Sequence, residues 1–138
     1  MKKIYIIFMS SWEHKKRERD ILNYFKEKHK NYIFETLHCL GFPSTQQVAS
    51  ANIIICYARS FNEDYARIKK IVKTNPNTWF AVRSHLEEHR EEAIKHGVKH
   101  CIYQSYEGIS ESAVDIWLLE KYLALSNEER MLGAGFNI

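Results

Sequence analysis

Long apolar runs, net charge and cysteine are all scarce in this sequence. The chain has 138 residues, a net charge of +3 and three cysteines. No apolar run approaches the ~18 residues of a membrane-spanning helix, so we expect no membrane segment. A charge this small does not by itself indicate nucleic-acid binding. The cysteines Cys39, Cys56 and Cys101 are odd in number and lie in or beside apolar runs, which favours reduced core residues in a cytoplasmic protein over a disulfide framework.

The remaining composition is that of one globular domain. The sequence is 45% hydrophobic and 27% charged, and its length suffices to bury a core. The basic and apolar start resembles a signal peptide, but the run is short and lacks a small-residue cleavage site, so a first strand is favoured. We predict a domain over residues 1–125, followed by a short helical turn and mobile tail over residues 126–138.

The run at residues 51–58 has four apolar residues in an unbroken row, and three of them are Ile53, Ile54 and Ile55. A short apolar run between polar residues predicts a strand buried on both faces, as parallel sheets require. Further strand patterns at 3–9, 31–40, 78–83 and 100–104 alternate with helical patterns at 12–30, 44–50, 61–73, 85–96 and 111–125. This alternation predicts an α/β fold, a doubly wound five-stranded parallel sheet with strand order 2-1-3-4-5.

Ligands of such sheets bind beyond the carboxyl ends of the strands, and these ends lack the usual chemical groups here. The central strand is followed by Tyr57, Ala58 and Arg59, with no carboxylate, glycine loop or nucleophile beside a base. Polar side chains near the strand ends could still contact a small ligand: Ser10, Ser11, Arg59, Ser60, Ser84 and Gln104.

Residues 93–106 end a helix at Gly97 and Val98, add a short strand, and close it with Gln-Ser-Tyr at 104–106. This segment resembles the fourth helix and fifth strand of response-regulator receiver domains, which carry Gly-Ala, a short strand and Lys-Pro-Phe. By order and length of elements the resemblance extends over residues 3–125. It implies a receiver-like, flavodoxin-like fold and a role in signalling.

The positions that carry phosphoryl chemistry in that family differ in this chain. The resemblance places its acidic pair at or near Phe8 and Met9, its phosphoacceptor Asp at Tyr57, its Ser/Thr at Arg83 or Ser84, its Lys at Gln104 and its aromatic switch at Cys101. Aspartyl phosphorylation needs a carboxylate nucleophile and carboxylates that hold Mg²⁺. We therefore predict a phosphorylation-independent signalling or interaction domain without a cofactor, in preference to an enzyme. The alternative is a small-ligand or nucleotide-binding enzyme that uses the polar strand-end residues.

Two short patterns suggest other sites and are better explained as helix surface. His85, Glu88 and His89 spell an H-x-x-E-H zinc pattern, but the neighbouring charges indicate a solvated helix face, so no metal site is predicted. The basic residues within 15–30 are interleaved with acidic ones, which also favours a solvated helix.

The last predicted helix, at 111–125, is apolar over more than the one face that a sheet covers. The excess indicates a second contact, which is either a partner subunit or a tail folded back through Met131, Leu132, Phe136 and Ile138. Receivers commonly dimerise through the equivalent face, and the resemblance implies the same here. We predict an interaction surface, in a homodimer or with a partner protein, that contains Tyr103, Tyr106, Trp117 and Tyr122.

Overall fold

Strands and helices alternate along the computed structural model, which describes residues 2–9, 15–57, 65–84, 87–95, 98, 100–103, 111–125 and 136–137. The strands are β1 (Lys2–Met9), β2 (Tyr32–Cys39), β3 (Ile53–Tyr57), β4 (Trp79–Ser84), β5 (His100–Tyr103) and β6 (Phe136–Asn137). The helices are α1 (Lys15–Lys28), α2 (Thr45–Ser50), α4 (Tyr65–Thr74), α5 (Glu87–Lys95) and α6 (Glu111–Ala124). The predicted βα alternation is therefore confirmed.

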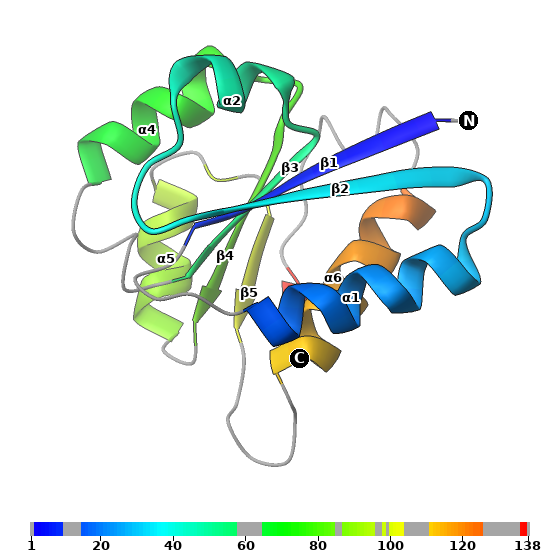
Figure 1. The fold of residues 1–138 in the computed structure, drawn as a ribbon. Coiled ribbons are helices and arrows are strands. Elements are labelled where there is room, and N and C mark those ends of the chain that lie inside the picture. The colour runs from blue at the N-terminus through cyan, green and yellow to red at the C-terminus, as the bar shows by residue number, and fades with distance from the viewer. Residues whose placement is uncertain are drawn as a thin grey trace.

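The strands form one parallel sheet with the order β2-β1-β3-β4-β5-β6 (Figure 1). This confirms the predicted order of the first five strands. The sixth strand was not predicted, because two residues carry no readable periodicity. Phe136 and Asn137 pair with Ile102 and Tyr103 of β5, so this part of the tail is strand and covers an edge that would otherwise expose backbone hydrogen-bonding groups.

Helices cover both faces of the sheet, with α1 and α6 on one side and α2, α4 and α5 on the other (Figure 1). Side chains alternate along each strand, so Ile53 and Ile55 belong to the cluster under α1 and α6, whereas Ile54 and Cys56 belong to the opposite cluster. All four are completely buried, as expected for a strand covered on both faces.

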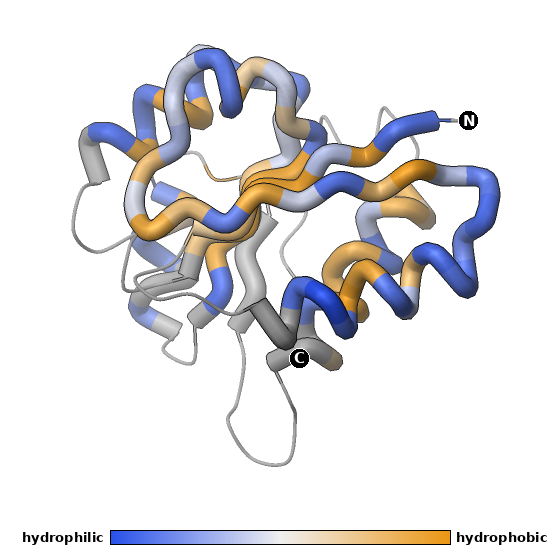
Figure 2. Tube along the Cα trace, viewed as in Figure 1, coloured by the Kyte–Doolittle hydropathy of each residue, from blue (hydrophilic) through white to orange (hydrophobic). Residues whose placement is uncertain are grey.

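Strand β2 lies at the sheet edge, as its partly alternating sequence indicated. Phe34 is buried against the α1 side, while Ile33 is 44% exposed. The hydropathy of the chain follows this difference, since β2 alternates in Figure 2 and the central strands are more uniformly apolar.

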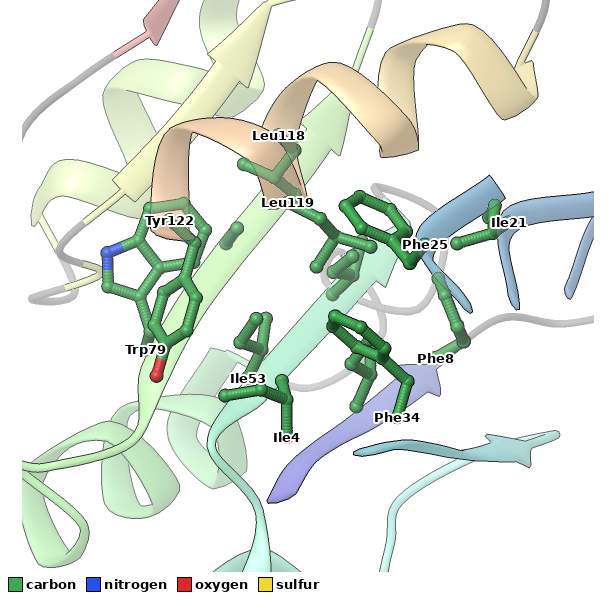
Figure 3. Close-up of a cluster of buried hydrophobic side chains, with 13 residues drawn as sticks. Ile4, Phe8, Ile21, Phe25, Phe34, Ile53, Trp79, Leu118, Leu119 and Tyr122 are labelled. Atoms are coloured by element: carbon green, nitrogen blue, oxygen red, sulfur yellow. The ribbon is translucent and has the colours of Figure 1, made fainter. Parts of the chain in front are cut away.

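Helix α6 contacts α1 and packs on buried side chains of the sheet, which accounts for much of its apolar surface. Leu118, Leu119 and Tyr122 are buried in the cluster under α1 and α6 (Figure 3). The ring of Tyr122 packs against Trp79 with their centroids 5.3 Å apart, and Tyr122 is only 5% exposed. The prediction that Tyr122 belongs to an interaction surface is therefore corrected, because this residue is part of the core.

Candidate functional site

The carboxyl ends of β1, β3 and β4 meet at one edge of the sheet, where this fold places its sites. The register pairs Met9 with Cys56, and Tyr57 with Arg83. Ser84, the last residue of β4, is paired with Tyr103 of β5. The strand-end positions singled out from the sequence are thus neighbours in the sheet.

The ends of β1 and β3 are filled by buried apolar side chains. Phe8 faces α1 and α6, whereas Met9 and Cys56 face the opposite layer, and none of the three is more than 1% exposed. Burial also raises the pKa of the Cys56 thiol, so this group stays protonated and is not a thiolate nucleophile. These three side chains therefore belong to the core.

The end of β4 carries a buried ion pair. The Arg83 Nη1 atom donates to Asp115 Oδ1 of α6 over 2.7 Å. The side chains of Arg83 and Asp115 are 3% and 0% exposed. Breaking such a pair on one side is costly, because it leaves a charge in a medium that solvates it poorly. The pair therefore holds α6 on β4.

The sequence interpretation missed this pair, although both residues carry a signal. Arg83 follows the apolar run 79–82 and, by strand alternation, shares a sheet face with Trp79. Asp115 precedes Leu118 by three residues and Leu119 by four, so it falls on the apolar stripe of its helix. Two residues of opposite charge, each at a position predicted to be buried, indicate a buried ion pair.

A second polar pair lies at the same edge, on β2, which β1 and β3 separate from β4. His38 of β2 is opposite Phe8, and its Nδ1 atom is 3.8 Å from Glu18 Oε1 in the first turn of α1. Both side chains are largely buried, at 9% and 18% exposure. Because two strands lie between them, the His38–Glu18 pair and the Arg83–Asp115 pair do not form one site.

Most of the sequence-predicted site residues are not brought together by the described structure. Ser10, Ser11, Arg59, Ser60, Gln104 and Tyr106 lie outside the described residues, as does His85. Ser84 and Tyr103 lie in strands and His89 lies in α5, but their side chains are not among those described. The small-ligand alternative therefore stays a prediction.

Of the four residues of the predicted interaction surface, only Trp117 and Tyr122 have described side chains. Tyr122 is buried in the core, whereas Trp117 is not. It is half-buried on α6, and Lys121 Nζ lies 5.5 Å from its ring centroid.

Among the described residues, no group of three or more potential metal ligands is found. The same part of the chain contains no helix long and apolar enough to cross a membrane.

Comparison with known proteins gives a fold and not a sequence family. No protein-family model and no curated protein sequence matches this chain. Among solved structures, a response regulator from Thermotoga maritima is similar, with a TM-score of 0.57 and 11% identity over 89% of this chain and 99% of that protein. A LuxR family DNA-binding response regulator from Silicibacter pomeroyi has a TM-score of 0.53 and 11% identity, over 85% of this chain and 89% of that chain.

A third similar structure is the RcsB response regulator of Salmonella typhimurium, described for its conformational dynamism for DNA interaction. It has a TM-score of 0.51 and 14% identity, over 90% of this chain and 69% of the other. The three similarities confirm the receiver-like fold that the resemblance implied.

Proposed function

We propose that this chain is a receiver-like protein-interaction domain that works without aspartyl phosphorylation. The observation that carries the proposal is the burial of the described side chains at the carboxyl ends of the central strands. Buried Phe8 and Met9 end β1, and the buried Arg83–Asp115 pair connects the end of β4 to α6. A phosphoryl site needs space and oxygen ligands at such an edge, whereas the described side chains that end β1 are apolar and buried.

The position expected for a phosphoacceptor is Tyr57, whose phenol cannot form an acyl phosphate. Mg²⁺ takes oxygen ligands, preferably carboxylates, and Phe8 and Met9 offer none. Asp115 is the one buried carboxylate described at the ends of the central strands, and Arg83 already occupies one of its oxygens. The residues described at this edge thus include no set of ligands for phosphoryl transfer.

Because of the same ion pair, the position of α6 does not depend on phosphorylation. Because the Arg83 guanidinium and the Asp115 carboxylate are both buried, their contact persists without any added group. The outer surface of α6 is then presented at all times. This favours an interaction domain that is constitutively competent to bind.

We place the interaction surface on α6 and β5, with Trp117, Tyr103 and Tyr106, and expect it to form a homodimer. Tryptophan is among the residue types that contribute most to the binding free energy of protein interfaces, and Trp117 is half-buried on the helix surface. Strand β6 covers the outer edge of β5, so dimerisation by adding strand to strand at β5 is disfavoured. The contact therefore rests on side chains of α6 and its neighbours.

Light scattering with and without acetyl phosphate and Mg²⁺ tests the proposal. We expect a dimer whose mass does not change with the phosphodonor, and which Trp117→Ala or Tyr106→Ala converts to a folded monomer. Tyr24→Ala is the matched control, because Tyr24 is likewise an aromatic residue with a lysine, Lys28, 5.3 Å above its ring, but on α1. A wild type that stays monomeric at high micromolar concentration, or a dimer that forms only with the phosphodonor, would contradict the proposal.

A further inference from the structure

A groove lies between α2 and α4, on the sheet face opposite α6. Its volume is about 420 Å³, within the range of pockets that bind ligands. Its lining combines apolar, cationic and uncharged polar residues: Pro43, Thr45, Val48, Arg67, Lys70, Ile71, Thr74 and Asn75. Figure 1 shows the two helices side by side at one end of the molecule.

The groove has an apolar floor and a cationic rim. Pro43 and Val48 are buried and Ile71 is half-buried, whereas Arg67 and Lys70 are exposed. None of the described residues that line the groove is a carboxylate. An apolar side chain placed on the floor would leave water, and a negative charge beside it would meet two cations.

Helix α4 makes this side of the groove strongly basic. It carries Arg67, Lys69, Lys70 and Lys73 and no acidic residue. The Arg67 guanidinium lies 4.4 Å from the centroid of the Phe42 ring, a contact that restricts its orientation. A cation held in place loses less conformational freedom when it binds an anion.

We propose that this groove binds an acidic, extended segment of a partner protein. The segment places one apolar side chain on the floor formed by Val48 and Ile71, and carboxylates against Arg67 and Lys70. This site goes beyond the proposed dimerisation surface, because α4 and α6 lie on opposite faces of the sheet.

The polar end of the groove favours a peptide over a compact polyanion such as a phosphate. Thr74 Oγ1 donates to the carbonyl of Lys70 over 2.8 Å. Asn75 Nδ2 donates to the carbonyl of Ile71 and to Thr74 Oγ1, both over 3.0 Å. These donors are therefore engaged in ending α4, and the helix end itself carries the negative part of the helix dipole. A small, highly charged anion would find few donors here, whereas a segment can spread its carboxylates over α4.

Fluorescence polarisation with a labelled peptide of glutamates around one central leucine tests the proposal in the full-length protein. We expect saturable binding that Lys70→Glu weakens about tenfold, because charge reversal replaces an attraction by a repulsion. Lys69→Glu is the matched control. It makes the same charge change on the same helix, but Lys69 does not line the groove, so we expect less than about a twofold effect from it because exposed charge pairs contribute little. Amide NMR of the wild type should show peptide-induced shifts at Val48 and Ile71.

Four results would overturn the proposal. Equal losses in Lys69→Glu and Lys70→Glu would mean non-specific attraction to α4. Equal binding of a peptide with serine in place of leucine would remove the role of the floor. Effective competition by tripolyphosphate would assign the groove to small anions. A change of light-scattering mass in Lys70→Glu would assign it to a second copy of this chain, and it would leave the Trp117 test of the dimer surface unaffected.

Discussion

The two faces of the sheet are covered in different ways. The cluster under α1 and α6 is rich in aromatic residues: Phe8, Phe25, Phe34, Trp79 and Tyr122. The cluster under α2, α4 and α5 is mostly aliphatic, and Phe80 is its one fully buried aromatic residue among those described. The first layer is also fixed by polar links, whereas the second contains the open groove. One face is therefore fixed by buried polar contacts, and the other contains the groove for which we propose a partner segment.

The polar links of the first layer differ in burial. Arg83 and Asp115 form a pair that is almost completely buried. At the other end of α6, His29 Nε2 and Glu120 Oε1 are 2.7 Å apart, with side chains 22% and 28% exposed. The contribution of an ion pair to stability changes strongly with burial, so these two links allow the comparison to be tested quantitatively.

The largest effect is expected at the buried link. Asp115→Ala removes the counter-charge of a buried guanidinium and should lower the free energy of unfolding by about 3–5 kcal/mol. Glu120→Ala, on the same helix, removes a partly exposed carboxylate and should cost ~1 kcal/mol or less. Urea unfolding followed by circular dichroism measures both. Equal losses would show that burial does not distinguish the two links.

A double substitution sharpens the same comparison. Arg83→Met combined with Asp115→Leu replaces the pair by apolar side chains and should recover most of the stability, since such replacements are often neutral or stabilising by about 1–4 kcal/mol. The proposed dimer should then persist in light scattering. A double variant as unstable as Asp115→Ala would mean that the site needs the charges themselves.

A smaller effect is expected in the second layer, at the start of α2. Ser44 Oγ accepts from the Gln47 amide over 3.1 Å, and Gln47 Oε1 accepts from the Ser44 amide over 2.8 Å. Loss of this capping box in Ser44→Ala should lower the free energy of unfolding by about 1 kcal/mol. Ser50→Ala is the control, because Ser50 Oγ only donates to the Gln46 carbonyl within the helix. Chemical denaturation measures the free energy of unfolding of both variants. A larger loss of stability in Ser50→Ala than in Ser44→Ala would contradict the predicted role of the capping box.

The smallest effect concerns Cys56 at alkaline pH. Burial raises the pKa of this thiol above its ordinary value of 9.0, so above that pH the unfolded chain releases a proton that the folded chain retains. Stability from this group is complete below pH 9 and falls as the pH rises, by less than ~1 kcal/mol up to about pH 9.5. The stability difference between wild type and Cys56→Ala should therefore shrink over this range. A difference that is constant with pH would contradict the burial of the thiol.

Much of the fold was readable from the sequence, because each buried strand is a local pattern. The isoleucine run of β3 and the alternation of β2 predicted a central and an edge strand, and both positions are confirmed. The β5–β6 pairing was not predicted as a strand pair, although the open alternative of a tail folded back agrees with it. Phe136 and Asn137 are strand residues because they pair with β5, and the sequence around them does not indicate this pairing.

The candidate site was less predictable, since it depends on contacts between distant residues. Arg83 and Asp115 are 32 positions apart, and only the crossover to α6 brings them together. The groove depends on how closely α2 and α4 pack, which side-chain volumes and loop geometry decide. By contrast, the apolar character of Phe8 and Met9 was plain in the sequence, and it gave the correct expectation of a buried strand end.

Amide NMR with beryllofluoride and Mg²⁺ tests most directly whether the carboxyl edge is closed to phosphoryl groups. Beryllofluoride binds where a carboxylate and Mg²⁺ can hold a phosphoryl-like group. We predict no shift at Met9, Tyr57 or Arg83 and no change in the resonances of α6. Saturable shifts at these strand ends that require both Mg²⁺ and beryllofluoride would contradict the account and reassign the protein to phosphorylation-dependent signalling.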